Sequence, residues 1–132
     1  VFTVDGNNLN GARDVVLAYC FANLEGYIDC GSYEGNGNAN GTFVYTGFSP
    51  AFVVCKSVDS TSDWFVFDNE RLGYNPDNNY FEWNDTTQAQ TTDAIDIYSN
   101  GFKFLLSGDP NVAETYIYLA MAHNPFKYAT AR

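Results

Sequence analysis

The stretch ETYIYLAMAHNPFKY, residues 114–128, decides the fold class of this chain of 132 residues. Its side chains alternate between two faces, and alternation with a period of two is typical of a β-strand. One face of the predicted strand carries Tyr116, Tyr118, Ala120 and Ala122, and the other carries Thr115, Ile117, Leu119 and Met121. Because both faces are largely apolar, we expect a second sheet to cover one face and a neighbouring chain or loop to cover the other.

The beginning of the chain repeats this pattern at a shift of 100 positions. The segment DVVLAYCFA (14–22) matches ETYIYLAMA (114–122), and upstream of these segments Phe2 matches Phe102. Internal repeats of this kind indicate a repeated structural element. The sequence therefore predicts a repeated strand pair at the N-terminal and C-terminal ends of the fold.

Three interpretations of the repeat stay open. In the first, residues 1–27 are the terminal strands of a preceding repeat unit, and residues 28–132 form a complete β-sandwich unit. In the second, residues 1–27 form a first edge of the same sandwich. The third is a coincidental likeness between two β-rich stretches. We favour the first interpretation, which predicts that residues 28–132 fold without the segment that precedes them.

Strand signals continue through the rest of the chain. Short runs rich in Val, Ile, Thr, Tyr and Phe are separated by clusters of Gly, Asn, Asp and Ser, such as EGNGNANG (34–41) and NPDNN (75–79). We expect strands near residues 1–4, 14–22, 29–34, 42–46, 51–56, 63–69, 94–98, 101–106 and 114–122. The sequence thus predicts an all-β fold, an antiparallel β-sandwich of the jelly-roll or lectin-like kind.

Composition and charge exclude several classes of protein. Hydrophobic residues make up 45% of the chain, which excludes an intrinsically disordered protein. No apolar run approaches the roughly 20 residues of a membrane-spanning helix, so we expect no membrane insertion. The net charge is −10 and Lys and Arg number 6, which opposes binding to a polyanion. We therefore expect no nucleic acid partner.

The cysteines and the histidine do not form the pattern of a metal site. Cys20, Cys30 and Cys55 lack the spacing of zinc ligands, and His123 is the only histidine. Cys20 lies in an apolar run, where a buried free thiol is expected. Cys30 and Cys55 are able to pair if neighbouring strands bring them together, which sequence alone does not decide. We expect no metal and no cofactor.

Two sets of acidic residues are candidates for chemistry. Asp59, Asp63 and Asp68 flank a predicted strand and offer oxygen ligands for calcium or a sugar, although such acids more often lie in solvated turns. Glu82 and Glu114 offer paired carboxylates for glycoside hydrolysis, which requires a spacing that sequence does not give. Nothing in the sequence marks an acid–base pair, so we expect no enzymatic activity and assign no catalytic residue.

Aromatic residues form 17% of the chain, and several lie beside polar loops. Aromatic rings stack on sugars and anchor protein interfaces. We predict a binding loop within YNPDNNYFEW (74–83), with the candidate residues Tyr74, Tyr80, Phe81 and Trp83. The candidate residues for self-association are Tyr116, Tyr118, Phe126 and Tyr128. The alternative is that these rings belong to an ordinary sandwich core.

Four stretches of the sequence resemble a known repeated domain. They are GSYEGNGNANGTFVYTGFSPAFVVCKSVDSTSDWFVFDNER (31–71), YNP (74–76), SNGFKF (99–104) and ETYIYLAMAHNPFKYATAR (114–132). Together they resemble the tandemly repeated C-terminal β-domain of marine bacteriophage virion proteins, of the tail or fibre type. The motifs GFSPAFV (47–53) and PFKY (125–128) are the most specific. Residues 73–92 depart from the pattern, and His123 replaces the usual acid.

This resemblance implies a structural protein located in the virion, and it supplies no catalytic residue. The expected partners are further copies of the chain, with a homotrimer favoured, other virion proteins, and polysaccharide on the host surface. Two alternatives stay open. One is a glycan-binding, lectin-like module, and the other is a head decoration or filament-forming subunit in which residues 1–27 pair with a neighbouring subunit's sheet.

Overall fold

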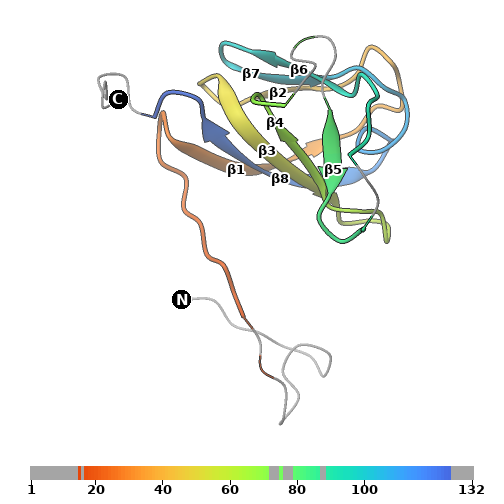
Figure 1. Cartoon of the computed structure of the whole chain (residues 1–132), viewed down its shortest axis with the longest axis horizontal. Helices are drawn as coiled ribbons and strands as arrows, with labels where there is room; N and C mark the ends of the chain where they lie inside the picture. The colour runs from red at the N-terminus through yellow and green to blue at the C-terminus, as the bar shows by residue number, and fades with distance from the viewer. Residues whose placement is uncertain (1–14, 16, 72–74, 76–78, 87–88, 126–132) are drawn as a thin grey trace.

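The computed structural model describes residues 15, 17–71, 75, 79–86 and 89–125, and these contain eight β-strands and no helix (Figure 1). The strands are β1 (Ile28–Glu34), β2 (Phe43–Tyr45), β3 (Pro50–Ser57), β4 (Phe65–Asp68), β5 (Tyr80–Glu82), β6 (Ile95–Tyr98), β7 (Gly101–Phe104) and β8 (Thr115–Ala122). The all-β prediction is confirmed, and every strand expected between residues 29 and 122 is present close to its expected bounds. The described residues form no helix that is long and apolar enough to cross a membrane.

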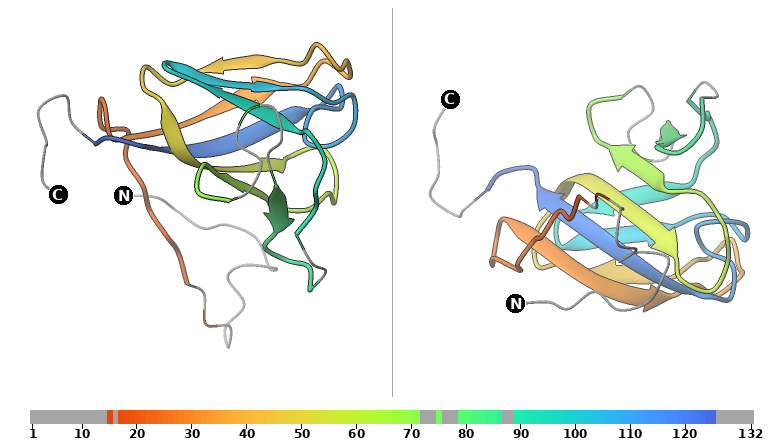
Figure 2. Two further views of the ribbon diagram at one scale, coloured as in Figure 1. Left: turned by 45° about the horizontal axis from the view of Figure 1, so that its top comes forward. Right: turned by 90° about the horizontal axis from the view of Figure 1, so that it is seen from below.

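The strands form two antiparallel sheets that pack face to face. The larger sheet has the order β1-β8-β3-β4-β5, and the smaller sheet has the order β2-β7-β6. Figure 2 shows the two layers on the left and, on the right, the face of the larger sheet that points away from the smaller one. The pairs β1–β8, β2–β7 and β4–β5 also occur in a jelly roll, but here β3 pairs with β4 and β6 pairs with β7. The predicted antiparallel sandwich is therefore present.

Strand β8 lies at the centre of the larger sheet, between β1 and β3. Its predicted alternation is confirmed, because Tyr116 and Ala120 are completely buried against the smaller sheet while Ile117 is exposed on the opposite side. The register aligns Leu119 of β8 with Val54 of β3, so these two side chains lie on the same face. We call this face, which points away from the smaller sheet, the outer face.

The core between the sheets is mainly aromatic. The Tyr33 ring stacks on Tyr116 at 5.1 Å between ring centroids and on Phe104 at 5.0 Å, which joins the two sheets. Phe67 also meets Phe104, at 6.4 Å. Each large apolar side chain that is removed from water in this way stabilises the fold by about 1.5–3 kcal/mol. The abundant rings of the sequence thus supply much of the core.

The predicted turn at residues 34–41 is held in place by a buried asparagine. The Asn111 side chain is completely buried, and its amide nitrogen donates to the backbone carbonyls of Asn38 and Leu106 at 2.9 and 2.7 Å. Its side-chain oxygen accepts hydrogen bonds from the backbone N–H groups of Asn36 and Thr42, each at 3.3 Å. This amide satisfies backbone groups that the turn itself leaves unpaired.

One expected strand requires correction, and one observed strand was not predicted. The described part of the predicted strand 14–22 forms no β-strand, and we call these residues, 15 and 17–22, the arm. Figure 1 shows the arm descending away from the sandwich. The predicted strand 1–4 lies outside the described residues. Strand β5, in contrast, was not predicted, because its three residues follow a polar, turn-like segment.

Candidate functional site

The outer face of the larger sheet is apolar but is not covered by the smaller sheet. It carries Ile117, Leu119 and Met121 from β8 and Phe52 and Val54 from β3. Antiparallel sheets that face water usually present polar side chains on that side. An apolar outer face is therefore a candidate interaction surface.

A groove of about 880 Å³ runs along this face. We call it the outer groove, with a floor of Phe52, Val54, Ile117, Leu119 and Met121 and a rim of Trp64 and Trp83. Most of its surface is apolar, with the Asn84 side chain as a polar group beside the rim. Such a surface favours an apolar occupant over a highly hydrated one.

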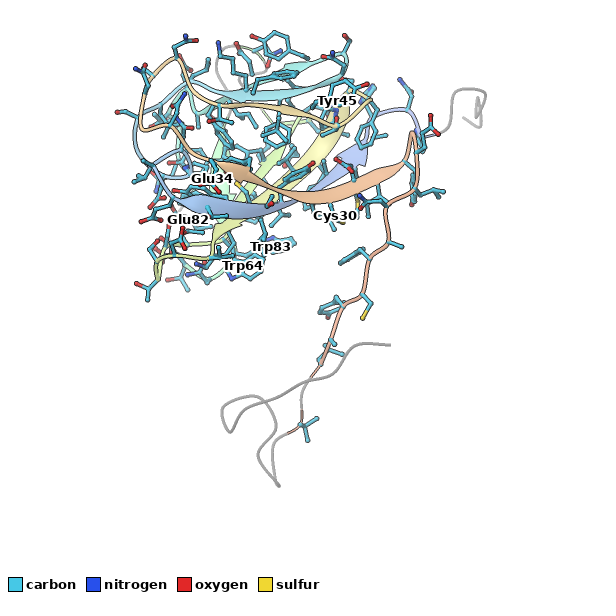
Figure 3. All side chains as sticks on the ribbon, turned by 180° about the vertical axis from the view of Figure 1, so that it is seen from behind. Cys30, Glu34, Tyr45, Trp64, Glu82 and Trp83 are labelled. Carbon is cyan, nitrogen blue, oxygen red and sulfur yellow. The ribbon has the colours of Figure 1, made fainter. Side chains whose placement is uncertain are left out.

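The two tryptophans of the rim are brought together by strand pairing. The backbone N–H of Trp83 donates to the carbonyl of Trp64 at 3.0 Å, just beyond the paired residues of β4 and β5. Trp64 and Trp83 are 40% and 56% exposed, and Figure 3 labels them side by side below the sheet. The Asn84 side chain supports the rim, since it accepts from the Trp64 N–H at 2.8 Å and donates to Asp63 at 2.6 Å.

The arm contributes two rings to the same groove. Tyr19 and Phe21 line it, yet they remain 77% and 54% exposed. The base of the arm is fixed by Asn23, whose side chain accepts from the Cys30 N–H at 2.8 Å and donates to the Cys30 carbonyl at 3.1 Å. The arm therefore starts at a point that is fixed against edge strand β1, and its two rings stay largely exposed beside the groove.

The predicted binding loop is divided between the core and the surface. Tyr80 is buried, with its ring 5.2 Å from that of Phe67, so it is a core residue and not a binding residue. Phe81 is half-buried, and the Arg71 guanidinium lies 4.4 Å from the centre of its ring. Trp83 is on the rim of the outer groove, and Tyr74 lies outside the described residues.

Two of the four residues predicted for self-association, Tyr116 and Tyr118, lie in the described part of the chain, on the inner face of β8. Tyr116 is completely buried and donates a hydrogen bond from its hydroxyl to Asp109, so it offers no surface to a partner. Tyr118 is half-buried, and its hydroxyl donates to Asp29 at 2.6 Å. Phe126 and Tyr128 lie outside the described residues. The exposed residue of β8, Ile117, is on the opposite face from Tyr116, as the alternation in the sequence predicts.

Sequence reasoning missed Trp64 as a site residue. The alternation of DWFVFDN places it on the face opposite Phe65, but its closeness to Trp83 depends on the pairing of β4 with β5. Burial, followed by repulsion from Asp63 and Asp85, raises the pKa of the neighbouring Glu82 above its ordinary value. The edge of the sheet near the tryptophans is therefore acidic.

The acidic candidates serve local structure. Asp59 accepts a hydrogen bond from the Thr115 backbone N–H at 2.7 Å, and Asp68 forms an ion pair with Arg71. The Glu114 carboxylate accepts from the hydroxyl of Ser57 at 2.7 Å. Across the residues that the structure describes, no three His, Cys, Asp or Glu side chains gather as a metal site would require.

The three cysteines are free thiols. Cys30 lies opposite Leu119 on the outer face, whereas Cys55 is buried on the inner face, so the two point to opposite sides of the sheet. Burial raises the pKa of the Cys55 thiol to about 12, and burial together with the Asp29 charge raises that of Cys30. Cys20 was expected to be buried but is exposed on the arm.

Comparison with known proteins gives one match. No curated protein and no solved structure matches the chain. A family model described as a domain of unknown function matches residues 1–125, so the match includes both the arm and the sandwich. Because this match spans nearly the whole sequence, the chain belongs to the family of the domain of unknown function DUF7483.

Proposed function

We propose that this chain is a structural, non-enzymatic module of a bacteriophage virion, of the tail or fibre type, and that copies of it associate through the outer groove. The observation that carries the self-association is the apolar outer face of the larger sheet, on which Ile117 is exposed and Phe52, Leu119 and Met121 are half-buried. The assignment to a virion rests on the resemblance of residues 31–71 and 114–132 to repeated virion domains.

The character of the outer groove supports a protein partner. Exposed apolar patches rimmed by polar groups mark interaction surfaces, and tryptophan is among the residues that contribute most to protein interfaces. Trp64 and Trp83 flank such a patch, and Ile117 in its floor is exposed. Coverage by another chain removes these side chains from water, which favours association.

Light scattering coupled to size-exclusion chromatography tests this proposal. We expect the wild-type chain to be an oligomer and the Ile117→Lys variant to be a monomer with an unchanged circular dichroism spectrum, because a lysine in the floor places a charge in the interface. Tyr45→Lys is the matched control, since Tyr45 is exposed on the smaller sheet. A wild-type chain that stays monomeric at high concentration contradicts the proposal.

The tryptophan pair supports a second candidate function, binding to polysaccharide on the host surface. Trp64 and Trp83 present two exposed rings, and Asn84 and Asp63 place hydrogen-bonding groups beside them. Rings of this kind stack on sugars while neighbouring polar groups recognise hydroxyls. Titration calorimetry with host polysaccharide tests this candidate, with binding by the wild type and loss of binding in Trp83→Ala as the expected result.

A further inference from the structure

We propose that the outer groove of one copy receives the arm of a second copy, so that copies of the chain are joined by exchange of their arms. This inference rests on the proposed self-association and names the segment that fills the groove. Tyr19 and Phe21 line the groove from the same chain, yet they stay 77% and 54% exposed.

The arm has the composition of a strand that requires cover. Leu17, Tyr19 and Phe21 alternate with the smaller Ala18, Cys20 and Ala22, and each of the three large side chains is more than half exposed. Residues 15–24 contain no charged side chain. An uncharged segment with alternating large apolar residues is able to bury one face on an apolar sheet without desolvating a charge.

The repeat in the sequence gives a second argument. The arm matches β8 at a shift of 100 positions, so Leu17 and Tyr19 correspond to Ile117 and Leu119 of the groove floor. Both edges of strand β8 are paired within its own sheet, one with β1 and the other with β3. Among the described residues the arm has no strand neighbour, and its alternating pattern suits it to lie against an apolar sheet face of another copy.

Hydrogen bonds fix the base of the arm against the edge of the larger sheet. Asn23 is bonded to Cys30, and the backbone groups of Leu24 and Ile28 pair with each other, which fixes where the arm leaves the sheet. From this point the arm descends away from the sandwich (Figures 1 and 3). The family match from residue 1 to residue 125 also includes the arm with the sandwich, as expected if the two act together.

Exchange of this kind lets each copy give one arm and receive one arm. Repetition of a head-to-tail contact closes into a ring when the rotation between copies allows it. A ring of three copies is the trimer that the sequence predicts. Every copy would then form the same interface, in which its groove holds the arm of one neighbour and its arm lies in the groove of another.

Cross-linking with a short bismaleimide tests the inference. Two proteins are prepared, both with Cys20→Ser and Cys30→Ser. The first carries Tyr19→Cys, and the second, whose chain differs in mass so that the two can be told apart, carries Ile117→Cys. Both positions are exposed, so neither substitution is expected to prevent folding. After mixing, we expect a cross-linked species that contains one chain of each size. Replacement of Ile117→Cys by Tyr45→Cys, on the smaller sheet, is the control that should give none.

A chain that carries both Tyr19→Cys and Ile117→Cys separates the alternatives. A link within single chains, without links between chains, overturns arm exchange in favour of closure of the arm on its own sheet. If the wild-type chain is an oligomer but no cross-link forms, arm exchange is overturned and the proposed self-association is not. A wild-type chain that is monomeric by light scattering overturns both.

Discussion

A Cβ atom added to Gly35 would lie 1.9 Å from the backbone carbonyl oxygen of Val112. The turn after β1 and the loop before β8 therefore touch through their backbones. The Gly35 N–H also donates to the Glu114 carbonyl at 2.9 Å, which prevents the two segments from separating easily. We expect Gly35→Ala to lower the free energy of unfolding by about 2 kcal/mol or more, because one backbone must move. Urea denaturation checks this, and Gly108→Ala, where the added Cβ meets only a side chain at 3.9 Å, is the matched control.

We expect substitution of the buried Asn111 to lower the free energy of unfolding as strongly as Gly35→Ala does. Asn111→Ala removes the donors to the Asn38 and Leu106 carbonyls and leaves those groups without this partner inside the protein. A loss of about 2–4 kcal/mol in the free energy of unfolding is expected, because several part-buried hydrogen bonds are lost together. Ser107→Ala, at an exposed position of the same loop, should change it by less than about 0.5 kcal/mol. Equal effects of the two substitutions would contradict the role assigned to Asn111.

The stability of the fold should decrease in alkaline solution. Burial raises the pKa of Cys55 from 9.0 to about 12, and burial together with the Asp109 charge raises that of Tyr116 above its ordinary value of 10.0. A raised pKa means that the protonated form is favoured in the fold, so this contribution is complete below pH 9 and is lost as pH rises toward 12. The buried thiol alone accounts for a slope of about 1.4 kcal/mol per pH unit in that window.

Urea denaturation at fixed pH between 8 and 11 measures this dependence. Cys55→Ala removes the thiol, and we expect its free energy of unfolding to fall less steeply than that of the wild type. The tyrosines remain in the variant, so some dependence should persist. Parallel curves for the two proteins would show that the Cys55 thiol does not contribute.

Removal of residues 1–22 should leave the sandwich folded. The truncated chain keeps Asn23 and its bonds to Cys30, and the core lies within residues 28–125. We expect a single cooperative thermal transition by circular dichroism, as the interpretation of residues 28–132 as a complete unit requires. Loss of that transition would show that the segment before Asn23 is part of the folded unit.

The sequence predicts the strands well where a pattern is local. The alternation around Tyr116 and Ile117 separates the inner from the outer face of β8, because each residue's direction depends only on its neighbours in the strand. The arm shows the limit of this reasoning. The same alternation indicates a strand-forming segment, but a strand also requires a partner with free backbone groups, and no pattern within residues 14–22 supplies one.

The candidate site depends on contacts between distant parts of the chain. Trp64 and Trp83 meet because β4 pairs with β5, and a three-residue strand gives too short a pattern to predict. Tyr80 was assigned to a surface loop for the same reason, although its ring packs against Phe65 and Phe67. Asn111 likewise has no local signal, since its hydrogen bonds reach a turn about seventy residues earlier.

The bonds from Asn23 to β1 also bear on aggregation. Strand β1 is at an edge of the larger sheet, and its Cys30 N–H and carbonyl are the groups on which a foreign strand would dock. The Asn23 amide occupies both of them, as another strand would, and so blocks the template at this point. A foreign strand is therefore hindered from pairing with β1 at Cys30, which opposes edge-to-edge aggregation at this side of the larger sheet.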